Sequence, residues 1–471
     1  MLTKQDIQDN YIDLINILRH TIAEDVKNLS KEVGMSWPTV NQKIRDLTNN
    51  GILCSIDQTE RRFMLNAKWG VLLGISIGVL DTQICILDYS FHHINLKKTQ
   101  GDSIIEKFAN TITDKLCAIG LKPTPEESSS EQDQQEHLSF SRCKDYSTIY
   151  RTCTQIIECA LEVFDTKLVS VGVSLPGIID TRKQSLIFSP NFLSLVGLET
   201  NDIIEKSTKE KLKTKDVFFQ AYHDTLSATT YEKEYFYISN KDNNCENSEN
   251  SENCIDIKNI ATLYWNYGFG CSYIIQNRLL TNAAGEFGHV NISSIVNNNE
   301  IVDTKLASFL NYNLNEHESE SGDQIIKISS LHPCACGNIT CLERLLRIFA
   351  FNSDNVDNFI VKTTVQNLKN YQSLNPLRYN ELINLLSIVI NTTVNLLSPE
   401  IVILSGKLLR SFPGLDDALK FKMYESALKS CAKNCTIIKG CHYNDVTAAG
   451  AAVLSYYQKY SKDEKLNIEW E

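Results

Sequence analysis

Several features of membrane and exported proteins are missing from this sequence. No run of about 18 apolar residues occurs, so a membrane-spanning helix is not expected. The N-terminal stretch MLTKQDIQDNYIDL is polar and acidic and has no apolar signal-peptide core. No internal repeat of fixed period is evident either. These absences predict a cytoplasmic protein that does not contact a membrane.

Basic residues are in deficit across the chain. The sequence contains 46 Lys and Arg against 57 Asp and Glu, a formal net charge of −11. This balance argues against nonspecific nucleic-acid binding by the whole chain, but a local module can still carry its own charged patch. Residues 1–35 hold four basic and six acidic side chains, whereas residues 36–70 hold five basic and three acidic ones. A small basic excess therefore falls on one N-terminal segment.

The length and composition are those of a soluble globular protein with more than one core. A chain of 471 residues predicts two or three structural units. Hydrophobic residues make up 42% and charged residues 22%, as in globular proteins. The 15 cysteines indicate buried thiols or metal ligands in a reducing compartment, because a disulfide framework belongs to oxidising surroundings.

Three segments resemble insertions. Residues 122–145, which contain PTPEESSSEQDQQEH, and residues 240–256, which contain NKDNNCENSENSENC, are polar and acidic. Such compositions cannot bury enough surface to order themselves, so both segments are predicted to be flexible. Residues 293–329 are rich in Asn and Glu but include one apolar helical patch, IVDTKLASFLNYNL, which predicts a partly ordered excursion.

Strand-like and helix-like segments alternate between these insertions. VLLGISIG, TQICILDYSF, KLVSVGVSL and EIVILSG are short apolar runs rich in β-branched residues, which is typical of buried strands. STIYRTCTQIIECALEVF and NELINLLSIVINTTVNLL repeat apolar residues at helical spacing. Strands that alternate with helices predict an α/β architecture.

Residues 1–67 predict three helices followed by a two-stranded wing. Gly34 ends the second helix, and Ser36 is placed to cap the third, which has Pro38 in its first turn. The third helix stops at Gly51, and ILCSIDQTERRFMLN then fits two short strands. This order is that of a winged helix-turn-helix, in which the second helix of the motif enters the major groove of DNA.

The third helix buries one face and leaves a polar face exposed. On the polar face, Asn41 can read adenine, Thr39 can contact a base or a phosphate, and Lys43 suits a phosphate. The residues predicted to contact DNA are Ser36, Trp37, Thr39, Asn41, Lys43 and Arg45 in this helix, with Arg61 and Arg62 at the wing tip. The alternative is a small helical protein-interaction module with an ordinary solvated face.

A cysteine cluster, HPCACGNITCLERL, is the sharpest motif in the chain. Three closely spaced thiolates, from Cys334, Cys336 and Cys341, can fill three corners of a zinc tetrahedron and need one nitrogen donor. His332 and His289 are the candidates for this fourth ligand. Two alternatives remain: buried cysteines without metal, and a competing group near the C-terminus. That group consists of Cys431, Cys435, Cys441 and His442.

The motifs in order resemble the ROK family, which groups bacterial sugar kinases with sugar-responsive repressors. The resembling segments are VLLGISIG…CILD, VGVSLPGIIDTRKQSLIFSPNF, FFQAYHDTLSATTYE, YGFGCSYIIQNRLLTNAAGEFGHV, CACGNITCLE, SPEIVILSGKLL and TAAGAAVLS. They run from about residue 71 to residue 457, and only the helix-turn-helix precedes them. The resemblance implies an α/β fold of two ribonuclease-H-like (actin-like) lobes that bind a sugar.

The resemblance also implies a domain plan. The winged helix-turn-helix would occupy residues 1–67. The first lobe would span residues 71–225, with a flexible insertion at 122–145, and would be completed by a C-terminal helix at 444–460. The second lobe would span residues 226–443 and hold the zinc motif, with insertions at 240–256 and 293–329.

A sugar site and a structural zinc site follow from the same resemblance. The implied sugar contacts are Asn191, Asp224, Glu286, His289 and Glu343. His289 would bind zinc through one ring nitrogen together with Cys334, Cys336 and Cys341, and would face the sugar with the other. Two features depart from the family pattern: His289 lies far before Cys334, and Thr340 replaces the second glycine of the motif.

The phosphate-binding loop of the family's kinases is altered in this chain. That loop reads D-I-G-G-T in the kinases, and here Ser76, Val79 and Leu80 replace its Asp, second Gly and Thr. Phosphoryl transfer needs a held metal and a backbone cradle for the phosphates, so a retained Asp224, the candidate base, is not sufficient. The sequence therefore predicts no kinase activity.

The predicted function is transcriptional repression controlled by a sugar or sugar phosphate. The predicted partners are a double-stranded DNA operator and further copies of the chain, in a homodimer or homotetramer. Two other functions stay open. One is an active ATP-dependent sugar kinase, like the family's glucokinases, with a DNA-binding arm. The other is a sugar-binding module whose N-terminal domain docks a protein.

Overall fold

The structure is a computed structural model. It describes residues 7, 10–20, 26–55, 63–97, 103–124, 137–180, 183–189, 192–246, 257–281, 287–289, 296–297, 300–301, 341–351 and 376–460. The described residues fall into two compact units. The first unit is drawn from residues 1–260, 273–284 and 441–471, and the second from residues 261–272 and 285–440.

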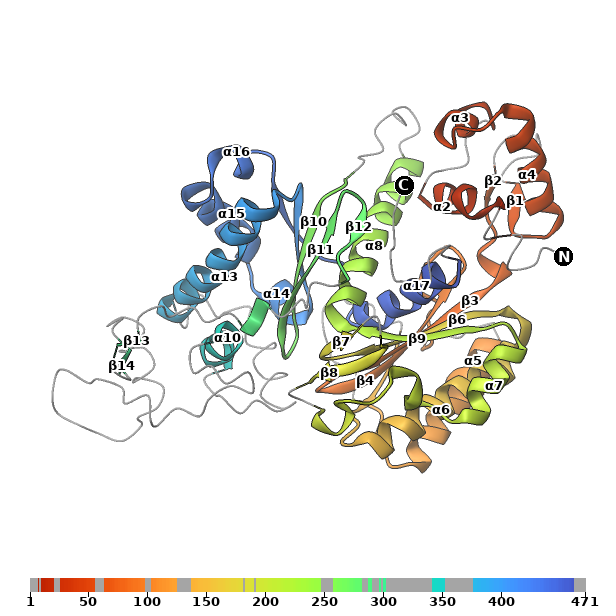
Figure 1. The fold of residues 1–471 in the computed structure, drawn as a ribbon, viewed down its shortest axis with the longest axis horizontal. Coiled ribbons are helices and arrows are strands. Elements are labelled where there is room, and N and C mark those ends of the chain that lie inside the picture. The colour runs from red at the N-terminus through yellow and green to blue at the C-terminus, as the bar shows by residue number, and fades with distance from the viewer. Residues whose placement is uncertain are drawn as a thin grey trace. The chain divides into compact units, whose positions relative to one another are not determined.

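The described part of the N-terminal module contains three helices, α2 to α4, and a two-stranded wing (Figure 1). The elements are α2 (Ile12–His20), α3 (Val26–Glu32), α4 (Trp37–Asn49), β1 (Leu53–Ser55), β2 (Phe63–Leu65) and a 3-10 turn, η1 (Ala67–Trp69). Helix α4 begins as expected, because the Ser36 hydroxyl accepts a hydrogen bond from the Thr39 N–H. Gly34 and Gly51 follow α3 and α4 with φ of 64° and 72°, the left-handed geometry that ends a helix.

A five-stranded sheet forms the centre of the first unit, in the order β5-β4-β3-β6-β9. Its strands are β3 (Val71–Ile77), β4 (Asp81–Asp88), β5 (Leu138–Ser141), β6 (Leu168–Leu175) and β9 (Phe218–His223). Strand β3 pairs antiparallel with β4 and parallel with β6, and β6 pairs parallel with β9. Strand β3 is buried along its whole length, as its continuous apolar sequence predicts.

Helices cover both faces of this sheet (Figure 1). They are α5 (Ser103–Ala118), α6 (Tyr146–Val163) and α7 (Lys206–Thr214) on one face, and α8 (Asp224–Glu246) and α17 (Val446–Tyr460) on the other. Within β3, Leu73 and Ile75 join the apolar cluster beneath α5 and α6, while the intervening Gly74 faces α17. Because successive side chains of β3 point to opposite faces of the sheet, the strand packs against helices on both sides.

Helix α17 lies unusually close to its neighbours. A Cβ added to Gly172 on β6 would stand 1.8 Å from the Ala451 carbonyl oxygen. A Cβ added to Gly450 would stand 1.7 Å from the Ser227 carbonyl oxygen on α8. The Gly-Ala-Ala sequence of α17 therefore lets it pack directly against a strand and a second helix.

A second five-stranded sheet has the order β12-β11-β10-β15-β16. Its strands are β10 (Ile260–Trp265), β11 (Phe269–Ile275), β12 (Arg278–Leu279), β15 (Ile401–Ser405) and β16 (Thr436–Lys439). The nearby helices are α10 (Leu342–Phe351), α13 (Pro376–Leu397), α14 (Lys407–Ser411), α15 (Leu415–Ser426) and α16 (Lys429–Ala432). This pair of sheets, each with its helices, confirms the predicted α/β fold class.

The remaining elements are short. They are the hairpins β7 (Ile178–Asp180) with β8 (Ser185–Phe188) and β13 (Val296–Asn297) with β14 (Glu300–Ile301), and the 3-10 turns η2 (Asp165–Lys167), η3 (Leu193–Leu195), η4 (Thr200–Ile203) and η5 (Phe287–His289). Among the described helices, none is long and apolar enough to cross a membrane.

All three expected insertions contain regular structure, and in 293–329 it is the short hairpin of β13 and β14. Strand β5 lies inside residues 122–145 and pairs with β4, because the apolar Phe140 is buried against the sheet core. Helix α8 continues to Glu246, so the first part of residues 240–256 is helical. Polar composition alone did not reveal these regular elements, because strand β5 and the end of helix α8 depend on pairing and helix continuation from neighbouring segments.

Candidate functional site

The loop that resembles a kinase phosphate loop is a tight hairpin turn between β3 and β4. The Gly78 N–H donates to the Asp81 carbonyl at 2.9 Å, and Val79 and Leu80 lie partly exposed in the turn. Ser76 is buried, and its hydroxyl accepts a 2.9 Å hydrogen bond from Thr447 at the start of α17. Ser76 thus ties β3 to α17 through this hydrogen bond.

The second glycine-rich loop, between β10 and β11, is held by Glu343. One carboxylate oxygen of Glu343 accepts a 2.9 Å hydrogen bond from the Phe269 N–H, and the other forms an ion pair with Arg347. The Arg347 guanidinium lies 4.6 Å from the centre of the Tyr267 ring. Glu343, predicted as a sugar ligand, therefore contacts protein groups through both oxygens, and Tyr267 occupies the loop with an aromatic ring.

Asp224 stands at the junction of β9 and α8. Its carboxylate lies 3.2 Å from His223 Nε2 and keeps about a quarter of its side-chain surface exposed (26%). His223 is oriented by a 2.8 Å hydrogen bond between its Nδ1 and the Thr225 hydroxyl. The structure thus leaves Asp224 reachable by solvent, next to an imidazole.

Several predicted site residues lie outside the described part of the chain. They are Asn191, Glu286, Cys334, Cys336, Arg61 and Arg62. Of the predicted zinc ligands, Cys341 is described and buried, and His289 ends the η5 turn. Helix α10, which starts directly after Cys341, contacts η5. The two described ligands therefore sit on contacting elements, which fits a shared metal ion.

The competing cysteine group near the C-terminus does not gather as a metal site. Cys435 is buried, and Cys431 accepts a contact from the Ser398 hydroxyl at 3.5 Å. The His442 Nδ1 lies 2.9 Å from the Tyr235 hydroxyl. Within the described ranges, the only cluster of three ligand atoms close enough for a metal ion lies elsewhere.

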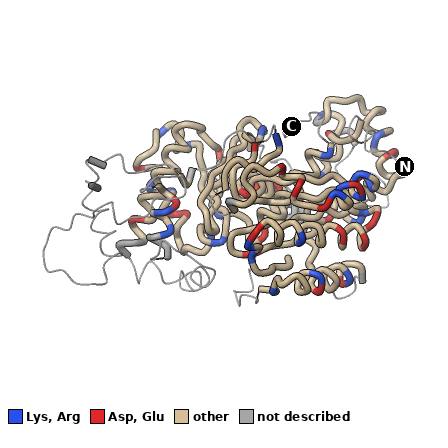
Figure 2. The backbone as a smooth tube through the Cα atoms, turned by 60° about the horizontal axis from the view of Figure 1, so that its bottom comes forward, with Lys and Arg blue, Asp and Glu red and all other residues tan. Residues whose placement is uncertain are grey.

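The exposed face of α4 carries most of the predicted DNA contacts. Trp37 is 51% exposed, Thr39 and Arg45 are exposed, and Asn41 is half-buried. The Lys43 ammonium donates to the Asn10 carbonyl. Basic and acidic positions are interspersed over the described chain, and the N-terminal module carries both (Figure 2). Helix α4 thus carries both basic and acidic side chains, Lys43, Arg45 and Asp46.

Arg19, which sequence reasoning did not single out, joins the N-terminal module to the first sheet. This arginine of α2 is only 2% exposed, and its guanidinium lies 3.8 Å from the centre of the Phe91 ring and 4.5 Å from that of Tyr456. It also donates to the Tyr89 carbonyl at 3.1 Å. Nothing in the local sequence marks this contact, because the aromatic partners come from the turn after β4 and from α17.

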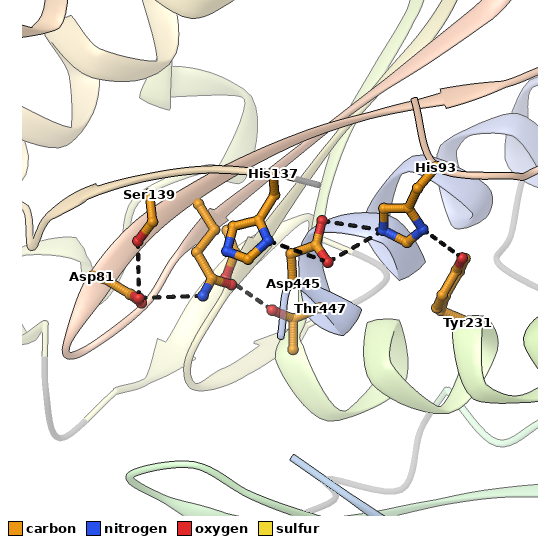
Figure 3. A network of polar contacts seen from close by, with 9 residues as sticks. Asp81, His93, His137, Ser139, Tyr231, Asp445 and Thr447 are labelled. Atoms are coloured by element: carbon orange, nitrogen blue, oxygen red, sulfur yellow. Dashed lines mark hydrogen bonds and ion pairs between the residues drawn. The ribbon is translucent and has the colours of Figure 1, made fainter. Parts of the chain in front are cut away.

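Sequence reasoning also missed a buried histidine–aspartate network at the start of α17 (Figure 3). His93 Nε2 lies 3.2 Å from both oxygens of Asp445, and His137 Nδ1 lies 3.8 Å from one of them. Burial opposes a charge on Asp445, but the imidazoles of His93 and His137 hold the pKa of that carboxyl well below its ordinary value. No short sequence motif contains the network, because Asp445 lies 352 residues beyond His93.

The described units define a class of protein: two α/β lobes with ribonuclease-H-like architecture, preceded by a winged helix-turn-helix. The family model described as "ROK family" matches residues 126–457. The chain belongs to the ROK family.

One solved structure shows the same fold at low sequence identity, and others resemble the chain less closely. A ROK family transcriptional regulator, described as a homologue of the E. coli MLC protein, superposes with a TM-score of 0.58 at 14% identity, over 95% of this chain and 97% of that chain. A ROK family glucokinase from Streptomyces griseus, solved with glucose and AMPPNP, gives 0.47 at 13% identity, over 82% and 99%. A ROK family protein from Streptococcus pneumoniae, solved with sucrose, gives 0.44 at 12% identity, over 82% and 97%. The search of curated proteins found no match.

Proposed function

We propose that this chain is a sugar-responsive, DNA-binding transcriptional repressor whose kinase-like lobes bind a sugar without phosphorylating it. The ROK family includes both repressors and kinases, so membership alone does not choose between them. The observation that carries the proposal is the β3–β4 turn. Ser76, near the end of β3, is buried and accepts a hydrogen bond from Thr447. The turn residues Val79 and Leu80 stand where a phosphate-binding loop would have a glycine and a threonine.

The altered turn removes two requirements of phosphoryl transfer. A kinase holds a metal ion near the phosphates and surrounds them with backbone donors. A serine hydroxyl already bonded to a neighbouring hydroxyl is a poor metal organiser. A valine side chain also restricts the close backbone approach that a glycine permits. The second loop adds support, since Tyr267 stands beneath Arg347 where a small or hydroxylated residue is expected in a kinase.

The proposed DNA contacts come from α4 and the wing. Asn41 and Thr39 would face base edges, whereas Ser36, Trp37 and Arg45 would contact the groove walls and phosphates. Arg61 and Arg62 would reach the backbone or minor groove from the wing tip. Two copies of the module in a dimer would bind two half-sites, with a spacing set by the dimer.

The effector would act by favouring one arrangement of the lobes. A sugar can shift an equilibrium only if it binds one state more tightly than the other. The proposed contacts are Asn191, Asp224, Glu286, His289 and Glu343. Arg19 would transmit the change, because it fixes α2 to the sheet and to α17 of the same unit.

The proposed zinc site would have a structural role. Cys334, Cys336, Cys341 and His289 offer three thiolates and an imidazole, a donor set suited to zinc. Bound zinc would supply a fixed anchor for the loop that presents His289. Replacing Cys336 with Ser is expected to abolish both zinc binding at the cluster and the sugar response. A normal response in that variant would contradict the role assigned to the cluster.

Thermal-shift screening against sugars and sugar phosphates is the experiment that tests the sensor. An effector present at 100 times its Kd raises the free energy of unfolding by about 2.7 kcal/mol, which a melting curve resolves. Fluorescence anisotropy with duplex DNA from beside the gene then tests the repressor. We expect binding that weakens with salt and changes when the effector is added. A sugar that shifts melting without any DNA binding would instead favour the protein-docking module.

One observation favours the alternative, an active sugar kinase. Asp224 keeps a partly exposed carboxylate beside His223, as a base for a sugar hydroxyl would require. A coupled assay with ATP, Mg²⁺ and the sugar panel separates the two functions. Asp224→Asn provides the control, because turnover that depends on Asp224 would identify a kinase.

A further inference from the structure

Four ligand-type side chains meet in the interior of the first unit. Cys85 lies on β4, His93 follows β4, and Asp445 directly precedes α17. The Cys85 sulfur, a ring nitrogen of His93 and a carboxylate oxygen of Asp445 all lie within 4.8 Å of one another. His137, just before β5, points its Nδ1 at the same carboxylate from the other side (Figure 3). Cys85, His93 and Asp445 therefore gather one sulfur, one nitrogen and one oxygen donor, and His137 offers a second nitrogen that is close to the carboxylate of Asp445.

The spacing of these donors fits a small metal ion. Adjacent ligands of a tetrahedral zinc ion, with bonds of about 2.0–2.3 Å, stand roughly 3.3–3.8 Å apart. The two histidine–Asp445 distances of 3.2 and 3.8 Å lie close to this range. A charge-assisted N–H···O bond would be shorter, at about 2.7–2.9 Å. The His93 contacts with Asp445, at 3.2 Å, are long for such a bond, and the 3.8 Å separation of His137 Nδ1 is beyond hydrogen-bond length and matches the spacing of two ligands on one ion.

One of these donors is buried without a hydrogen bond. His137 Nδ1 has no hydrogen-bond partner among the described residues, and the His137 side chain is 3% exposed. Leaving a buried polar atom unsatisfied costs about 1–3 kcal/mol. A metal ion between His137 and Asp445 would coordinate this nitrogen. The missing hydrogen bond at His137 Nδ1 is therefore independent support for a bound ligand.

The surroundings orient His93 as they do in metal sites. Its Nδ1 lies 2.8 Å from the Tyr231 hydroxyl, which leaves Nε2 directed at Asp445. Its ring stacks on Tyr443, with centroids 3.8 Å apart and planes at 18°. Metal-binding histidines are held in this way, through the ring nitrogen that does not touch the metal.

Charge balance also favours a divalent cation. The side chains of Asp445 and His93 are 0% and 1% exposed, and Cys85 is buried. A divalent ion bound to one thiolate, one carboxylate and two neutral imidazoles gives a complex with no net charge. Such a complex avoids the desolvation cost that an unbalanced buried charge carries.

We propose that Cys85, His93, His137 and Asp445 form a second transition-metal site, of the zinc type, separate from the cysteine cluster around Cys336. The sulfur and nitrogen donors select zinc over magnesium or calcium, which prefer oxygen ligands. The close cluster would supply three ligands and His137 the fourth, and a site with four protein ligands would be structural. It would fasten α17 to the strand β4 and to the segment leading into β5.

Metal analysis of the full-length protein tests this site. The background variant Cys334→Ser/Cys336→Ser removes the cysteine cluster as a zinc site. After purification with zinc and dialysis, we expect this variant to retain one equivalent of zinc. Addition of Cys85→Ser should reduce the content to less than a tenth of an equivalent. Cys153→Ser, which changes another buried cysteine of the same unit, is the matched control and should leave the zinc in place.

Cobalt substitution provides a readout that depends on the thiolate. Co²⁺ bound in the background variant should show a sulfur-to-cobalt charge-transfer band, which Cys85→Ser abolishes and Cys153→Ser preserves. If Cys85→Ser does not fold, His137→Gln supplies the same comparison and should lower the metal content. A background variant without zinc and without a cobalt band would overturn the proposal, as would full retention of zinc in both ligand variants.

Discussion

The Arg19 contact gives a prediction whose size follows from the structure. The guanidinium is desolvated and lies 3.8 Å from the centre of the Phe91 ring, a cation–π arrangement worth about 2 kcal/mol when buried. Its hydrogen bond to the Tyr89 carbonyl, from a charged donor, adds about 1.5–3 kcal/mol. Arg19→Ala removes both and leaves a cavity, so we expect the free energy of unfolding to fall by about 4 kcal/mol.

Chemical denaturation followed by tryptophan fluorescence measures this change. Trp69 stacks near Tyr89, with ring centroids 4.5 Å apart, and so reports on the region around the contact. Arg19→Lys keeps the charge but lacks the planar guanidinium, so it should lower the free energy of unfolding by about half as much as Arg19→Ala. Arg45→Ala, an exposed arginine of the same module, should change stability by less than about 0.5 kcal/mol. If Arg19→Ala matched Arg45→Ala, the structural role of Arg19 would be refuted.

Three further predictions concern the first unit. Burial raises the pKa of Cys159 to about 11, so this thiol stays protonated and unreactive at pH 8. Alkylation of the native protein should therefore label the exposed Cys117 rapidly and Cys159 only on unfolding. Equal labelling rates would contradict this. Asp145 caps α6 by accepting from the Thr148 N–H at 2.8 Å, and Asp145→Ala should lower stability by about 1 kcal/mol, whereas Asp145→Asn should retain the cap. Because the same hydrogen bond lowers the pKa of Asp145, its contribution should be present above about pH 4 and disappear as the pH falls further, in an acid titration of stability. Gly450→Ala should cost roughly 3 kcal/mol or abolish soluble expression, since the close contact of α17 with α8 leaves no room for a methyl group; a neutral effect in thermal unfolding would show that α17 can shift.

The fold was accessible from the sequence because its signals are local. Strand β3 is a continuous apolar run, α6 has helical periodicity, and Ser36 and Gly51 mark the ends of α4. Each of these features is decided within a few residues of chain. Strand β5 was missed because it is short and follows a polar stretch, so only its pairing with β4 reveals it.

The site was less accessible because its geometry is made by distant residues. Ser76 was identified as a departure from the kinase loop, but its bond to Thr447 depends on α17 packing against β3. Glu343 was predicted as a sugar ligand, but its hydrogen bond from the Phe269 N–H and its ion pair with Arg347 could not be foreseen from the sequence. In each case tertiary packing, which no spacing in the sequence encodes, determines what the side chain contacts.

The most direct test of the central claim is a kinase assay performed with the sugar that thermal-shift screening identifies. The protein, at saturating sugar with ATP and Mg²⁺, is followed for ADP release in a coupled assay. Our account predicts that the sugar raises the melting temperature and changes DNA binding, while ADP release stays at the rate without sugar. Sustained, sugar-dependent ADP release that Asp224→Asn abolishes would contradict it and identify the chain as a kinase.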